Sequence, residues 1–207
     1  LLPSFPALSQ HFATSAADIA LSVSLFAIGI SMSQLLIGPL SDALGRKTLL
    51  LAGMAVSVGG ALGCVWARDY NWFLVFRVVQ ALGCGCFVLS QALVQDLFVG
   101  QERDRLRILM VTASGLCISL SPLAGTLLQS LMGWPGSFYV FSAIAVLVFL
   151  KALATLENPP IVRSGPRTGI LQAYRRVCSN FSFVAYWLIS AIVFACHFSF
   201  IVVSPLI

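Results

Sequence analysis

Six long apolar stretches, joined by short polar segments, constrain this chain more than any other feature. A helix needs about 20 mainly apolar residues to cross the hydrocarbon core of a bilayer. Only a helix or a closed barrel satisfies its own backbone hydrogen bonds there. The sequence therefore predicts an all-α polytopic membrane protein, with spans at roughly 17–39, 48–67, 71–94, 106–131, 136–156 and 181–203.

Composition excludes the main alternatives. Hydrophobic residues make up 59% of the 207 residues and charged residues only 9%, whereas soluble domains carry about 25% charged residues. So few charges cannot cover the surface of a soluble enzyme, and disorder requires low hydrophobicity and high charge. The 6 cysteines lie mostly in apolar stretches and lack zinc-ligand spacing. We therefore expect them to pack as small apolar residues, with no metal or other cofactor.

The placement of the basic residues predicts the orientation of the chain. Lysine and arginine are enriched in the short cytoplasmic loops of membrane proteins. Ten of the 12 basic residues lie on alternate joints, which must share one side of the membrane, and the opposite side has Arg68. The positive charge thus faces anionic lipid rather than nucleic acid. The ten residues are Arg46, Lys47, Arg103, Arg105, Arg107, Lys151, Arg163, Arg167, Arg175 and Arg176.

Arg77 lies within the third apolar stretch, where an arginine is costly and usually has a function. At 100° per residue, a sector of about 60° contains Arg77, Gln80, Cys84, Gln91 and Gln95. Such a stripe predicts a polar interior rather than a lipid-facing surface. The alternative is that Arg77 extends to the outer membrane interface. No acid lies at its depth, so its counter-ion would be on another segment, on a ligand, or absent.

The joint at residues 38–47 contains an acid and two bases in a loop too short to form a domain. A tight turn with positive charges on the cytoplasmic side explains the bases and glycines. It does not explain Asp42, four residues before Arg46, or Asp96 at the same level. We interpret this acid–base–acid cluster as a latch between helices that opens and closes.

Small residues recur in the fourth stretch at Ala113, Cys117, Ser121 and Gly125, with Pro122 among them. This spacing allows close helix approach in lipid, and the proline favours a kink. Helix packing is the simplest interpretation of the pattern.

Two further signals concern single positions. Residues 15–18 (SAAD) are typical of a capping box at the start of the first span. His197 is the titratable residue of the last span, and we expect it to be hydrogen-bonded to a neighbour rather than to carry protons.

Two segments together resemble signatures of the major facilitator superfamily. Residues 34–47 (QLLIGPLSDALGRK) resemble its loop signature between helices 2 and 3, motif A, in the form found in bacterial drug/proton antiporters. Residues 77–83 (RVVQALG) resemble its helix 4 signature, motif B, with Ala81 where glycine is common.

Three weaker matches extend this resemblance over essentially the whole chain. Residues 121–125 (SPLAG) are similar to the helix 5 antiporter signature, motif C, with Ser121 in place of glycine or alanine. Residues 2–8 and 204–205 resemble parts of helices 1 and 7 in the bicyclomycin/chloramphenicol-resistance group.

The resemblance implies a major facilitator fold made of two six-helix halves with cargo bound between them. Residues 1–156 would be the N-terminal half, lacking most of helix 1 but holding helices 2 to 6. Residues 157–180 would be a cytoplasmic linker between the halves. Residues 181–207 would be helix 7, the first of the C-terminal half. We therefore expect an internal piece of a protein that is monomeric when full length.

The resemblance also implies a role for each motif. In this group an acidic residue of helix 1 commonly takes part in proton coupling, and it would lie just before Leu1. The implied sets are a substrate and proton-coupling cavity of Arg77, Gln80 and Gln34, a cytoplasmic conformational relay of Asp42, Arg46 and Asp96, and an antiporter motif of Ser121, Pro122 and Gly125.

The leading hypothesis is proton-driven export of small hydrophobic drugs or metabolites by alternating access in a bacterial cytoplasmic membrane. The partners would be a small-molecule substrate, protons and membrane lipid, with no nucleic acid. Proton-coupled uptake or exchange of a polar metabolite stays open, because fold does not fix cargo or direction. A non-transporting membrane sensor is the alternative from another class. An enzyme is not expected, since the sequence lacks a nucleophile–base pair, a metal cluster and a phosphate loop.

The orientation gives a first test. We expect the loops holding Arg46, Arg103 and Arg167 to be cytoplasmic and those holding Asp69 and Trp134 to be external. Single cysteines at these positions, in a background without the native cysteines, can be labelled with an impermeant maleimide from each side. Labelling of position 103 from outside would contradict the topology.

Overall fold

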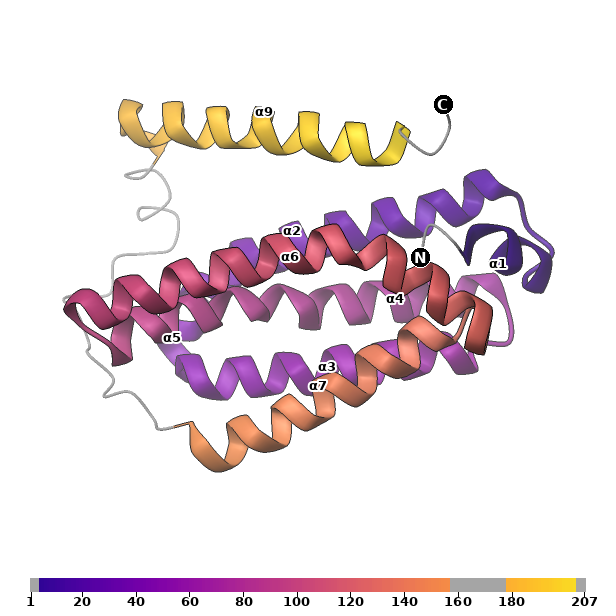
Figure 1. Ribbon diagram of the computed structural model, residues 1–207, viewed down its shortest axis with the longest axis horizontal. Coiled ribbons are helices and arrows are strands. Elements are labelled where there is room, and N and C mark those ends of the chain that lie inside the picture. Colours follow the sequence, from indigo (N-terminus) through magenta and orange to yellow (C-terminus); the bar gives the residue numbers. More distant parts are fainter. Residues whose placement is uncertain (1–3, 157–177, 204–207) are drawn as a thin grey trace. The chain divides into compact units, whose positions relative to one another are not determined.

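The computed structural model describes residues 4–156 and 178–203 (Figure 1). The chain divides into two compact units, Leu1–Val162 and Arg163–Ile207. The second unit contains α9 (Phe181–Val203). The first contains α1 (Phe5–His11), α2 (Ala16–Leu44), α3 (Arg46–Trp66), α4 (Tyr70–Gly85), the 3₁₀ helix η2 (Cys86–Val88), α5 (Leu89–Leu97), α6 (Gly100–Met132) and α7 (Gly136–Thr155).

Five helical runs of the first unit are long and apolar enough to cross a membrane. They are α2, α3, the continuous run Tyr70–Leu97, α6 and α7, and they coincide with the first five expected stretches. The sixth stretch falls on α9, whose residues Phe181–Val193 form a shorter apolar helix within the searched part. The all-α polytopic architecture is thus confirmed. The side chain of His197 and residues 157–177 of the expected linker lie outside the described part.

The long helices of the first unit run lengthwise beside one another (Figure 1). The α3 helix packs against both α4 and α7, and α2 packs against α4, so these four helices follow the spatial order α2, α4, α3, α7. The α6 helix contacts α5 and α7. None of its described residues is buried. Most of its surface is therefore left uncovered by the other described helices of this unit.

Glycines allow α3 and α4 to approach closely. A Cβ atom at Gly60 would lie 2.4 Å from the backbone nitrogen of Gln80, and one at Gly83 would lie 2.4 Å from the backbone nitrogen of Ser57. Small residues at helix contacts allow this proximity in lipid, where no hydrophobic driving force draws helices together. The α3–α4 pair therefore forms the tightest part of the bundle's centre.

The helix ends are fixed by local chemistry. Ser15 and Asp18 form the expected capping box, with the Asp18 N–H donating to the Ser15 hydroxyl at 3.1 Å and the Ser15 N–H to the Asp18 carboxylate at 3.2 Å. Asp69 accepts from the Trp72 N–H at 3.0 Å at the start of α4. Gly45 joins α2 directly to α3 at φ +88°, a conformation that glycine adopts without steric cost.

Two apolar clusters hold the bundle at its opposite ends. The first surrounds the fully buried Phe73 and joins Leu8 of α1, Ile19 of α2 and Phe138 of α7. The second lies near the Gly45 turn and includes Ile37, Leu49, Met54, Cys86, Leu89 and Leu93. Each cluster lies next to one of the two polar sites described below.

The glycine contact gives a matched pair of variants in the full-length protein. Gly60→Ala should destabilise it by about 1–3 kcal/mol, because the new methyl group meets the α4 backbone. Gly59→Ala should be neutral or stabilising by about 0.5–1 kcal/mol, as expected for a helical glycine, because its Cβ would meet nothing within 4 Å. Thermal unfolding followed by tryptophan fluorescence measures both. Equal unfolding temperatures for the two variants would contradict the close α3–α4 packing.

Candidate functional site

The guanidinium of Arg77 lies inside the bundle rather than at its surface. Only 4% of this residue is exposed. Its Nη1 donates a hydrogen bond of 2.7 Å to the side-chain oxygen of Gln80, one turn further along α4. The structure thus brings together two residues of the expected cavity and does not show Arg77 extending to the interface.

Aromatic rings supply two further contacts of this guanidinium. Its central carbon lies 4.0 Å from the ring centroid of Phe26 on α2 and 5.9 Å from that of Phe138 on α7. Both distances are within the range of a cation–π interaction, which is strongest when the cation is removed from water. Within the described residues, the Arg77 Nε has no hydrogen-bond partner. One donor of the guanidinium is therefore still available.

The contact between α2 and α4 explains a departure from the motif B pattern. The sequence has Ala81 where glycine is common, and Gly29 of α2 lies opposite it. A Cβ at Gly29 would be 2.8 Å from the Cβ of Ala81. The space that a glycine at position 81 would leave is thus left by Gly29 on the facing helix instead.

Gln34 was expected in the same cavity, but the structure places it elsewhere. Ser33 donates to the Leu82 carbonyl at 2.8 Å, so this part of α2 lies beyond Arg77 along α4. Gln34 is exposed and lines a pocket with Asp42 and Arg46. Of the three residues expected to line the cavity, the structure therefore brings together Arg77 and Gln80.

The polar stripe on the third span does not continue unbroken. Arg77 and Gln80 are buried, whereas Gln91 and Gln95 are exposed. The 3₁₀ helix η2 lies between the two pairs. A 3₁₀ turn has fewer residues per turn than an α-helix, so it rotates the second part of the stripe relative to the first.

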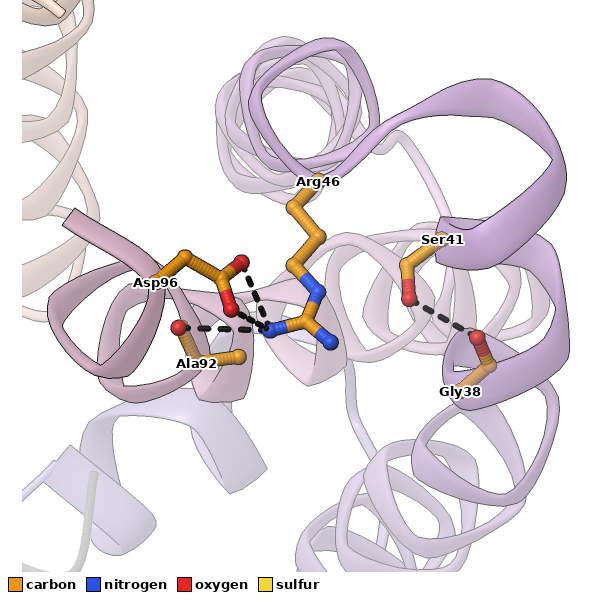
Figure 2. Close-up of polar contacts among 5 residues, drawn as sticks. All are labelled: Gly38, Ser41, Arg46, Ala92 and Asp96. Atoms are coloured by element: carbon orange, nitrogen blue, oxygen red, sulfur yellow. Dashed lines mark hydrogen bonds and ion pairs between the residues drawn. The ribbon is translucent and has the colours of Figure 1, made fainter. Parts of the chain in front are cut away.

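The second site joins the start of α3 to the end of α5 (Figure 2). Arg46 Nη1 lies 2.8 Å from the Asp96 carboxylate and donates to the Ala92 carbonyl at 3.3 Å. About a third of each charged side chain is exposed, 32% for Arg46 and 33% for Asp96. A cation at this position also interacts favourably with the C-terminal end of α5.

Asp42, the third member of the expected relay, lies beside this pair without joining it. Its side chain is exposed, and among the described residues no ion pair involves it. Asp42, Arg46, Gln34 and Ala92 line the same pocket, of about 300 Å³. The structure thus brings two relay residues, Asp42 and Arg46, to one pocket, and Arg46 also contacts the third, Asp96.

The expected antiporter motif lies on α6. The Ser121 hydroxyl donates to the Ile118 carbonyl of its own helix at 3.0 Å. Ser121 and Pro122 are exposed and Gly125 is half-buried. Pro122 lies inside the helix rather than at its end. Close helix packing at this motif, expected from the small residues, therefore has no counterpart among the described residues of the first unit.

Two contacts in the structure were not predicted from the sequence. Phe26 has a recognisable signal, because it continues the spacing of the buried small residues Ser22, Gly29 and Ser33 on α2 and so shares their face. Lys47 donates to the backbone carbonyl of Leu156 at the end of α7. A basic residue beside a helix C-terminus is favourable, but no local pattern indicates which helix it will meet.

Membrane-length helices around a buried guanidinium, with an ion pair at one helix junction, are typical of polytopic membrane transporters. The family model of the Major Facilitator Superfamily matches residues 1–207. The chain belongs to this family, whose members are transporters rather than enzymes, and it is a multi-pass protein of the bacterial cytoplasmic membrane.

Curated relatives agree with this assignment. The uncharacterized MFS-type transporter YdgK of Bacillus subtilis is 27% identical over the whole chain and 53% of its own length. A chloramphenicol resistance protein of Pseudomonas aeruginosa is 34% identical over 66% of the chain and 33% of its own length. The multidrug resistance protein MdtL of Salmonella dublin is 29% identical over 80% of the chain and 42% of its own length. The chain thus spans about half or less of these relatives.

The relay can be tested by transport assays of the full-length protein. Asp42→Asn and Arg46→Ala should each lower transport on the order of tenfold, which corresponds to a conformational bias of about 1.4 kcal/mol. Insertion and expression should change little, since exposed ion pairs contribute only ~0–1 kcal/mol to stability. The charge exchange Arg46→Asp with Asp96→Arg should recover part of the loss. Normal transport by both single variants would contradict the relay and show that this site is only a positively charged turn.

Proposed function

We propose that the whole protein exports small hydrophobic molecules in exchange for protons, by alternating access. The buried guanidinium of Arg77 is the observation that carries this proposal. A cation inside a membrane bundle costs free energy and is typical of ion or substrate pathways. Its contacts with Gln80 and Phe26 leave the Nε donor without a partner among the described residues, so one donor is left for a carboxylate or a cargo acceptor.

The names of the relatives support the cargo class. Proteins named for chloramphenicol resistance and multidrug resistance match 66% and 80% of this chain. Both names refer to resistance to drugs. We extend this to a cargo of small hydrophobic drugs for the protein of this chain, because the family model matches residues 1–207 and so covers both the Arg77 segment and the Arg46 turn.

Proton coupling follows from competition at Arg77. A carboxylate on helix 1 would be kept ionised by the nearby guanidinium. Binding of a proton would weaken this attraction, and cargo would compete for the same donors. Each event would shift the balance between inward-open and outward-open states by its differential affinity for the two. The Arg46–Asp96 contact would then stabilise one of these states.

The proposal predicts the behaviour of two Arg77 variants in reconstituted full-length protein. Arg77→Lys and Arg77→Ala should both impair drug-stimulated proton flux, with alanine worse. An ammonium group is a point donor and does not replace the planar fork of a guanidinium. Loss of the guanidinium also makes the partner carboxyl easier to protonate, so the pH optimum of flux should move upward.

Arg68→Ala serves as the control, because Arg68 is an exposed arginine of the joint before α4. Its flux and pH profile should match the wild type. A wild-type flux and profile in Arg77→Lys would contradict the proposed coupling. Proton-driven accumulation in place of export would favour uptake, and an absence of flux under any gradient would favour a sensor.

A further inference from the structure

We infer that Phe26 is a positioning residue for Arg77, whose ring holds the guanidinium in place while leaving its donors free for a carboxylate or cargo. This inference deepens the proposed function and rests on it for the role in transport. The contact itself can be tested without any transport assay.

The geometry of the contact is that of a strong cation–π pair. The central guanidinium carbon lies 4.0 Å from the Phe26 ring centroid, well inside the limit of about 6 Å for this interaction. Arg77 is only 4% exposed, so water does not compete effectively for the charge. The ring of Phe138, at 5.9 Å, is close to the limit and contributes less.

An aromatic face holds a guanidinium differently from a carboxylate. A ring attracts the charge through its face and has no oxygen lone pair that would occupy an N–H donor, as a carboxylate has. Gln80 occupies one donor, at Nη1, and Nε has no partner among the described residues. Phe26 therefore fixes the position of the guanidinium while leaving its hydrogen-bonding edge available.

The close approach of α2 and α4 fixes the ring in this place. Phe26 lies three residues before Gly29, so both residues lie on the same face of α2. Gly29 meets Ala81 of α4, where an added Cβ would be 2.8 Å from the Ala81 Cβ. Phe26 and Arg77 lie one turn before Gly29 and Ala81 on their respective helices. The helix contact thus brings the ring to the guanidinium.

Chemical modification of Arg77 tests the contact directly. Phenylglyoxal is added to purified full-length protein, and modification of each arginine is followed by peptide mass spectrometry. Phe26→Leu and Phe26→Met keep apolar bulk but remove the ring, and should raise the rate at Arg77 roughly tenfold, equivalent to about 1.4 kcal/mol. Phe26→Tyr keeps the ring and should stay close to the wild-type rate.

Two controls separate loss of the ring from general loosening of the bundle. Phe141→Leu alters a half-buried phenylalanine of α7 that packs in the first apolar cluster, and should leave the Arg77 rate unchanged. The exposed Arg68 should react equally in all variants. An unchanged Arg77 rate in both Phe26→Leu and Phe26→Met would overturn the inference. Equal increases in Phe26→Tyr and Phe26→Leu would also overturn it, because shape rather than the ring would then matter.

Proton flux supplies a second readout. Without the ring, the guanidinium is no longer held in place for the carboxylate, so the carboxyl group becomes easier to protonate. The flux optimum of Phe26→Leu should therefore move to higher pH, in the same direction as in the Arg77 variants but by less, and Phe26→Tyr should restore the wild-type profile. The described titratable groups near Arg77 are Cys64 of α3 and Cys84 of α4, and both are unchanged in these variants. A shift to lower pH in Phe26→Leu would overturn the positioning role. If the ring protects Arg77 from phenylglyoxal but no proton flux is detected, the contact is confirmed and only the proposed function is refuted.

Discussion

The arrangement of the helices in the first unit depends on how closely the α3 and α4 backbones approach one another. At Gly60 and Gly83 there is no space for even a methyl group between the helices. Gln80 faces Gly60 across this contact and also accepts the hydrogen bond from Arg77. The packing contact and the polar site are therefore parts of one interface. In lipid, where apolar side chains gain little by leaving their surroundings, such backbone proximity is a principal source of helix association.

The two polar sites share the same framework. The run Tyr70–Leu97 carries Arg77 in its first part and Asp96 near its end, with η2 between them. The α2 helix contributes Phe26 to the first site and lines the pocket of the second with Gln34 and Asp42. A 3₁₀ segment within a long helix often marks a hinge. The two polar sites thus lie on one continuous helical run, on either side of its 3₁₀ segment.

At two positions, a residue on the facing helix supplies what the helix 4 signature by itself does not show. Ala81 departs from the common glycine of the helix 4 signature, yet Gly29 on the facing helix provides the space. Likewise, the positive charge of Arg77 is met by the ring of Phe26, a residue outside the motifs. In both cases the physical requirement is met by a pair of residues from α2 and α4. A signature on one helix shows only half of such a pair.

The sequence by itself determined the helical spans and the capping box at Ser15, and its family resemblance implied a relay of Asp42, Arg46 and Asp96. Hydropathy and capping act over a few residues, and the Gly45 turn brings the relay level with the end of α5. Only the tertiary structure decided that Phe26 meets Arg77, that Gln34 lies with Asp42 rather than Arg77, and that no described residue of α6 is buried. These outcomes depend on the relative register and rotation of helices. Register is fixed by contacts such as Gly29 against Ala81, between residues more than fifty positions apart, which no local pattern contains.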